Sequence, residues 1–255
     1  MSALDFKGFH ATRHFIGLDG LRAVAILGVI WHHSPHGLSG AIALRGFLGV
    51  DLFFVLSGFL ITTLLIREKQ RFGRISLKNF WARRFLRLMP AYYAMLAALA
   101  CVYLVFKPGS EETRTLISGL SVYALYLSNW IHPGAPFLGP TWSLATEEQF
   151  YIVWPLVEAF SPPAVLAAIW AGALAFNQAV NFGALDATIA SVWGLSPDRH
   201  PEILETTFTP ILLGVGLAHV LSWRRGFDAA AAIAGFRHAP YAWAAIALAI
   251  MAWPS

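Results

Sequence analysis

The stretch from Leu18 to Ile66 dictates how the rest of the chain is interpreted. It opens with LDGLRAVAILGVIWHH (residues 18–33) and closes with GVDLFFVLSGFLITTLLI (residues 49–66), two apolar runs that contain ionisable side chains. These side chains are Asp19, Arg22, His32, His33 and Asp51. At bilayer depth each one is costly unless it is paired or faces a polar cavity, so such residues are interpreted first as functional.

Composition indicates the class of protein. The chain is 57% hydrophobic and only 13% charged, with a mean hydropathy of +0.60, whereas a soluble domain is about 25% charged. We therefore predict an integral protein of the cell membrane, all-α, in which residues 1–255 form one polytopic bundle of about seven or eight membrane segments. The single cysteine, Cys101, excludes a disulfide framework and a cysteine-based metal site, and no metal or resident cofactor is expected.

The apolar runs predict seven crossings, and each of the first three is near the roughly 20 residues that a helix needs to cross hydrocarbon. The expected spans are residues 15–33, 46–66, 86–106, 141–160, 164–180, 208–223 and 239–253. Residues 115–130 are apolar but short and interrupted by serine and asparagine, so we interpret them as a re-entrant segment that lines a cavity. If they cross instead, Arg224 and Arg225 fall outside; if they return, this pair lies in the cytoplasm, as the positive-inside tendency prefers.

The loop at residues 67–87 indicates the orientation. It carries eight basic residues against the single acid Glu68, an excess that belongs on the cytoplasmic side. The amino terminus is then cytoplasmic too, the first span delivers His33 to the outer end, and the second begins outside near Asp51. A tight turn is expected at residues 161–163, because proline disfavours helix in the residue before it. Residues 181–205 are expected to form an external loop.

The first two spans carry a cation, a base and an acid. Arg22 and His33 are eleven residues apart, so they share a helix face about 16 Å apart along the axis. Asp19 can pair with Arg22 at i, i+3, and Asp51 can reach His33 and fix its tautomer, as a carboxylate does behind a general base. The alternatives are a snorkelling or structural arginine, a histidine at the water interface, and an acid favoured by a helix dipole.

Two further clusters carry polar groups into apolar surroundings. Ser143 and Glu147 share a helix face in TWSLATEEQFY, where the alternative is a capping box that uses Ser143 or Thr141. Arg84 and Arg87, at i, i+3, suit a polyanion, because arginine forks match phosphate oxygens. The alternative there is that these arginines set topology and touch anionic lipid.

Four ordered motifs resemble those of the acyltransferase-3 family of polytopic membrane enzymes. The first motif is the first span, in which ten residues separate an arginine from a histidine. The other three are GVDLFFVLSGFLITTLL, FWARRFLRLMPAYY and TWSLATEEQFYIVWPL. The resemblance covers residues 16–156. It implies transfer of an acyl group, usually acetyl, from cytosolic acyl-CoA to a hydroxyl of an extracytoplasmic glycan, lipid-linked sugar or related molecule.

The resemblance also implies roles for individual residues. His33 matches the essential histidine and Arg22 its partner, whereas His32 has no assigned role. Arg84 and Arg87 match the family's pair of arginines near the acyl-CoA phosphates. Ser143 and Glu147 match its serine and glutamate signature beside the site. His33 then acts as general base or carries the acyl group itself, with Asp51 or Glu147 orienting it.

Two expectations qualify this function. The family usually has more spans than are counted here, and the chain stops at Ser255 directly after an apolar run, so it resembles a carboxy-terminally incomplete member whose own activity is open. The alternative class is a transporter or lipid-binding membrane protein whose charges line a permeation path. A nucleic-acid partner is not indicated, because the net charge of +4 is concentrated in one juxtamembrane loop.

Overall fold

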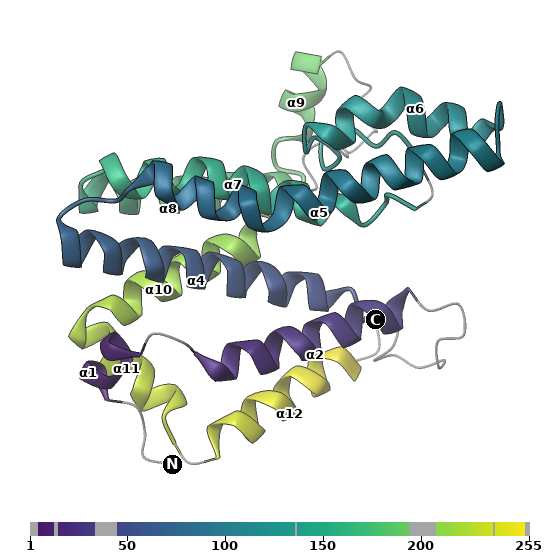
Figure 1. The fold of residues 1–255 in the computed structure, drawn as a ribbon. Coiled ribbons are helices and arrows are strands. Elements are labelled where there is room, and N and C mark those ends of the chain that lie inside the picture. The colour runs from purple at the N-terminus through teal and green to yellow at the C-terminus, as the bar shows by residue number, and fades with distance from the viewer. Residues whose placement is uncertain are drawn as a thin grey trace. The chain divides into compact units, whose positions relative to one another are not determined.

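The computed structural model describes residues 5–12, 15–33, 45–135, 137–193, 208–236 and 238–252. Over these ranges the chain is made of helices and turns without strands, which confirms the all-α prediction. It divides into two compact units, which are described separately below (Figure 1). Unit 1 comprises residues 1–71 and 210–255, and unit 2 comprises residues 72–209.

The predicted spans coincide with helices to within a few residues at most ends. Unit 1 contains α1 (Phe6–Ala11), α2 (Ile16–His32), α4 (Leu48–Phe72), α10 (Thr209–Ser222), α11 (Arg224–Ala234) and α12 (Ala239–Ala252). Unit 2 contains α5 (Leu77–Phe106), α6 (Glu111–Ala124), α7 (Thr141–Phe160), α8 (Pro163–Asn181) and α9 (Asp186–Trp193). Among the described helices, α4, α5 and α8 are long and apolar enough to cross a membrane, and α10 is apolar but shorter.

Of three expectations about connecting segments, two were wrong or incomplete and one was confirmed. The basic segment at residues 67–87 is mostly helical, because α4 continues to Phe72 and α5 begins at Leu77, and arginine and lysine are good helix formers. Only residues 73–76 turn, with Gly73 at a positive φ of 72°. The expected loop at residues 181–205 contains α9, and its residues 194–205 lie outside the described part of the chain. The turn at residues 161–163 is present, with Pro163 as the first residue of α8.

Small residues let the helices of unit 1 approach closely. A Cβ on Gly58 of α4 would overlap the Ile211 carbonyl oxygen of α10, and a Cβ on Gly214 would overlap that of Val55. Such close contact between backbones is how membrane helices pack without a hydrophobic driving force between them. Large apolar side chains such as Leu27 (64% exposed) stay uncovered on α2, as expected for a surface that meets lipid.

The amino-terminal helix α1 is tied to the end of α4 by Arg67. The guanidinium donates to the carbonyl oxygens of Thr12 (2.6 Å) and Phe9 (2.7 Å) and lies over the Phe9 and Phe15 rings. On its other side α1 packs against Phe227 of α11, whose ring centroid lies 5.7 Å from that of Phe9 (Figure 1). Helix α1, the end of α4 and the start of α11 therefore meet at one end of unit 1.

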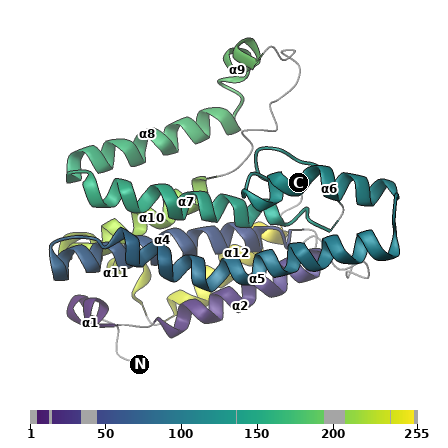
Figure 2. The same ribbon diagram turned by 45° about the horizontal axis from the view of Figure 1, so that its top comes forward.

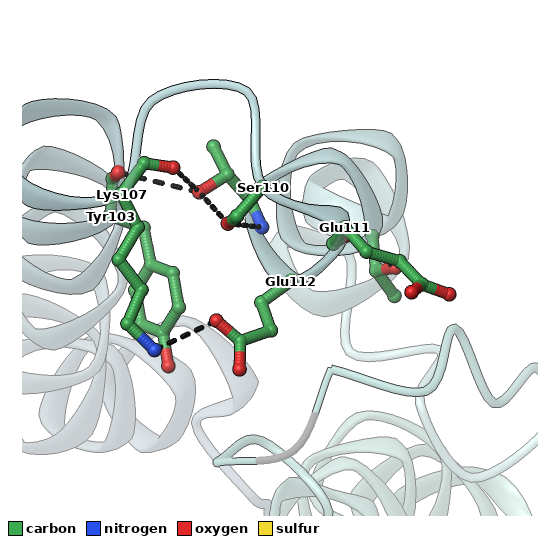
Figure 3. A network of polar contacts seen from close by, with 7 residues as sticks. Tyr103, Lys107, Ser110, Glu111 and Glu112 are labelled. Carbon is green, nitrogen blue, oxygen red and sulfur yellow. Dashed lines mark hydrogen bonds and ion pairs between the residues drawn. The ribbon is translucent and has the colours of Figure 1, made fainter.

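In unit 2, α6 packs along the second half of α5 (Figure 2). The turn between them is held by polar contacts: Ser110 caps α6 by accepting from the Thr113 amide, and Lys107 donates to Glu112 at 2.8 Å (Figure 3). This hydrogen bond and the Glu112 charge raise the pKa of Lys107. At the far end of α6 the Tyr92 hydroxyl donates to the Tyr123 carbonyl oxygen at 2.9 Å.

Residues 125–140 then run back toward the α5–α6 turn. Pro133 lies against Gly119 in the middle of α6, and the Phe137 ring lies 5.9 Å from that of Tyr103. Leu138 packs in one apolar cluster with Tyr103 and other residues of α5, α6 and α7. The segment thus enters as α6 and returns beside α5 as an irregular chain.

Candidate functional site

His33 ends α2 as its C-cap residue. Its Nδ1 atom donates at 2.9 Å to the Val29 carbonyl oxygen, which also accepts from the backbone N–H of His33 at 3.1 Å. With the proton on Nδ1, the neutral ring carries its lone pair on Nε2. His33 is also exposed, so Nε2 is able to accept a proton from a substrate.

Asp51 does not take the position on Nδ1 that the sequence suggested for it, because the Val29 carbonyl oxygen occupies that position. Asp51 lies in the first turn of α4, half-buried, where the helix dipole favours an acid. The alternative interpretation of Asp51 therefore has direct support. A role of Asp51 toward the rest of the His33 ring stays a prediction.

Arg22 lies on the same helix as His33 and pairs with Asp19, as predicted. Its Nη1 atom lies 3.8 Å from Asp19 Oδ1, and the two side chains are 28% and 52% exposed. The pair offsets part of the cost of placing a cation and an acid near hydrocarbon. Arg22, His33 and Asp51 all belong to unit 1.

The capping alternative for the TWSLATEEQFY motif is wrong. The N-cap of α7 is Pro140, without a side-chain cap, and the first turn contains no acid. Ser143 instead donates to the Pro140 carbonyl oxygen at 3.0 Å, and Glu147 lies half-buried one turn further along. A polar role for Ser143 and Glu147 stays a prediction, and helix capping no longer competes with it.

The adjacent acid, Glu148, was missed by sequence reasoning and is the more deeply buried of the two. Its side chain is 2% exposed, and among the described residues its Oε1 atom has no hydrogen-bond partner. A signal was present, because Glu148 shares a helix face with the apolar positions Ala145, Tyr151 and Pro155. That stripe is the buried face of α7.

Gln149 fastens the irregular segment of residues 125–140 to α7. Its Oε1 accepts from Asn129 Nδ2 (2.9 Å) and Trp130 Nε1 (2.8 Å). Its Nε2 donates to the Tyr126 carbonyl oxygen and to Asn129 Oδ1, both at 2.8 Å. These four hydrogen bonds hold the Tyr126 backbone and the side chains of Asn129 and Trp130 against α7.

The structure separates the environments of Arg84 and Arg87. The Arg84 guanidinium lies over the rings of Phe80 (5.7 Å) and Tyr151 (5.3 Å) and interacts electrostatically with Glu148. Arg87, one turn later on α5, is exposed. Although the two arginines are spaced i, i+3, Arg84 is held between α5 and α7, whereas Arg87 is accessible.

These polar groups fall into two sets. Unit 1 carries Arg22, His33 and Asp51, and unit 2 carries Arg84, Arg87, Ser143 and Glu147. Within each unit the expected residues lie on the expected helices, and assembly of the two sets into one site stays a prediction. Among the described residues there is no cluster of three or more His, Cys, Asp or Glu side chains that could hold a metal ion.

Comparison with known proteins identifies the family. The O-acetyltransferase OatA of Staphylococcus aureus is 42% identical over 176 residues, which cover 63% of this chain and 28% of that protein. The peptidoglycan O-acetyltransferase OatA of Listeria monocytogenes is 34% identical over 235 residues, which cover 85% of this chain and 35% of that protein. The chain thus spans about a third of the length of these relatives.

No solved structure matches the chain. The family model described as an acyltransferase domain matches residues 15–254, nearly the whole chain, and includes every motif discussed above. The resemblance of the four ordered motifs is thereby confirmed. This integral membrane chain belongs to the acyltransferase-3 family.

Proposed function

We propose that residues 1–255 act as one membrane-embedded O-acyltransferase domain that moves an acetyl group from cytosolic acyl-CoA to a hydroxyl of a cell-wall glycan. Family membership supports the reaction class. The name of the Listeria relative, a peptidoglycan O-acetyltransferase, supports a glycan acceptor outside the cell. The donor is proposed from the exposed Arg87 and the neighbouring Arg84, since arginine suits the phosphates of coenzyme A.

The observation that carries the proposal is the bond from His33 Nδ1 to the Val29 carbonyl oxygen. Because that bond leaves the lone pair on Nε2, His33 can take the proton of an acceptor hydroxyl while its oxygen attacks the thioester carbonyl. The new C–O bond forms as the C–S bond breaks, and the proton passes from Nε2 to the departing coenzyme A sulfur. Arg22, Asp51, Ser143 and Glu147 are proposed to orient His33 or to stabilise its charged form.

A covalent relay uses the same residue. Nε2 would attack the thioester carbonyl as the C–S bond breaks, and coenzyme A would leave as a thiolate while the acetyl group stays on Nε2. The acceptor hydroxyl would then attack that acetyl group as the C–N bond breaks, and the proton it releases balances the one that the coenzyme A thiolate takes up. Such a relay suits a reaction whose donor and acceptor arrive from opposite sides of a membrane. Single-turnover labelling with radioactive acetyl-CoA in the absence of acceptor distinguishes the two routes, because only the relay leaves label on the protein.

We place the amino terminus in the cytoplasm, with seven crossings and residues 115–130 re-entrant. Unit 1 supports this topology, because the contacts of Arg67 and Phe227 with α1 bring the ends of α4 and α10 to the same end of that unit. If α4 and α10 both finish on one side, the chain between them crosses an odd number of times. Crossings by α5, α7 and α8 satisfy this parity, and a fourth by α6 would violate it.

The test is reconstitution of the full chain in proteoliposomes with labelled acetyl-CoA on one side and a peptidoglycan fragment on the other. The proposal predicts label in ester linkage on the fragment, with release of one coenzyme A per acetyl group. Passage of a solute without consumption of acetyl-CoA would favour the transporter alternative and contradict the proposal.

A further inference from the structure

Two polar oxygens in the interior of unit 2 have no assigned role. Glu148 Oε1 and the hydroxyl of Tyr126 are both buried and both lack a hydrogen-bond partner among the described residues. The side chains that carry them are 2% and 6% exposed. Leaving such a group unsatisfied destabilises the fold, and more so when the group is charged, so two together call for an explanation.

The two groups come from different elements that are fastened to each other. Tyr126 lies in the irregular segment after α6 with a positive φ of 54°, a conformation that non-glycine residues rarely adopt. Gln149, the residue after Glu148, holds the Tyr126 carbonyl oxygen at 2.8 Å. The Tyr126 ring stacks on Tyr92 at 4.6 Å, and its hydroxyl interacts electrostatically with Glu148. Strain of this kind often accompanies functional sites.

We propose that Glu148 Oε1 and the Tyr126 hydroxyl form a subsite for a hydroxyl group of the glycan acceptor. A carboxylate accepts a hydrogen bond from a sugar hydroxyl, and a phenol donates one to the same or an adjacent oxygen. In the present structure both oxygens are covered by protein, so binding of the acceptor requires residues 125–135 to move away from α7. The inference rests on the proposed transfer to a glycan and names residues that bind its acceptor.

Charge favours the acceptor over the donor as the occupant. Coenzyme A is a polyanion, and a carboxylate repels its phosphates, whereas a sugar hydroxyl is neutral. Arg84 interacts electrostatically with Glu148 and offsets part of the cost of burying that acid. Whether it is ionised or protonated, the carboxyl group keeps an oxygen that can accept a hydrogen bond from a neutral sugar hydroxyl.

The experiment compares Tyr126→Phe and Glu148→Gln with wild type in the full chain reconstituted in nanodiscs. Steady-state rates are measured while a soluble peptidoglycan glycan fragment and acetyl-CoA are varied in turn. We expect each variant to raise the KM for the fragment about tenfold, as expected for loss of one hydrogen bond to a substrate hydroxyl. The KM for acetyl-CoA should stay within about twofold of wild type.

Tyr93→Phe is the matched control, because the Tyr93 hydroxyl already donates to the Ala124 carbonyl oxygen at 2.8 Å. It should leave the KM for the fragment unchanged. An unchanged fragment KM in Tyr126→Phe, or an equal rise in the KM for acetyl-CoA, overturns the subsite. Tyr126→Phe alone decides the outcome if Glu148→Gln does not fold, and an inactive wild type contradicts the proposed function instead.

Discussion

His33 Nδ1 lies 2.9 Å from the carbonyl oxygen of Val29, one turn earlier on α2. The backbone of its own helix therefore orients this ring and determines which nitrogen carries the proton. Such a bond is independent of side-chain substitutions elsewhere. We therefore expect Asp51→Asn to leave the His33 tautomer unchanged. If this variant loses activity, the loss comes from the missing carboxylate charge near His33 Nε2.

Donor binding should depend on Arg87 without a loss of stability. Arg87→Gln removes an exposed cation and should weaken acyl-CoA binding about tenfold, with the melting temperature unchanged. Arg84→Gln should weaken binding and also lower the melting temperature, because this guanidinium stacks on Phe80 and Tyr151. Calorimetric titration with acetyl-CoA measures the first effect. Arg74→Gln serves as the control. If the double variant Arg84→Gln/Arg87→Gln binds acetyl-CoA as tightly as wild type, both arginines determine membrane topology and do not bind the donor.

Arg67 should fix the amino-terminal helix. Arg67→Ala removes hydrogen bonds to Phe9 and Thr12 and should cost about 2–4 kcal/mol of the free energy that docks α1. Trypsin cleavage after Lys7, followed by mass spectrometry, should then become at least about tenfold faster. Arg74→Ala, in the turn after α4, serves as control. Equal cleavage rates in the two variants would show that α1 docks without Arg67.

Docking of α1 should weaken in acid. Burial, and secondarily the Arg67 charge, lowers the pKa of His10 below its usual 6.5. The docked state therefore disfavours the protonated ring, so docking is strongest above pH 6.5 and is lost progressively as the pH falls below that value. Hydrogen exchange of the α1 amides, corrected for intrinsic rates, should accelerate in acid. The same pH dependence in His10→Gln would contradict this assignment.

Close contact between α4 and α10 should make Gly214 intolerant of a methyl group. Gly214→Ala would push a Cβ into the Val55 carbonyl oxygen and should destabilise the protein by about 1–3 kcal/mol. Gly172→Ala on α8 is the matched control, since nothing lies within 4 Å of its added Cβ, and alanine favours helix. Melting temperatures in detergent should fall for Gly214→Ala alone. A fall of the same size in the control would point to a general effect of the substitution.

The sequence predicted the helices and most of their bounds, because apolar runs of membrane length carry a strong signal. Helices α1, α9 and α11 escaped prediction, since each is short. Helices α1 and α11 are stabilised by packing of Phe9 against Phe227, a contact between distant parts of the chain. The basic segment was expected to be a loop from its charge alone. Charge indicates the side of the membrane and does not exclude helix.

Within the site, the sequence identified the helices that carry the polar residues but not every partner. The pairing of Asp19 with Arg22 followed from i, i+3 spacing and is present. The partner of His33 is a backbone carbonyl oxygen, and a pattern of side chains does not report on such a group. Glu148 was passed over for Glu147 because Glu147 shares a helix face with Ser143, whereas the apolar stripe pointed to the neighbouring acid.

The most direct measurement compares His33→Ala with His32→Ala in acetyl transfer from labelled acetyl-CoA to a peptidoglycan fragment. Both variants are reconstituted at equal amounts after their membrane insertion has been verified. The two histidines are adjacent, with ring centroids 5.1 Å apart, so His32→Ala controls for the loss of an imidazole at this end of α2. We predict that His33→Ala loses activity by about a hundredfold or more, while His32→Ala retains most of it. Normal transfer by a correctly inserted His33→Ala variant would contradict the account.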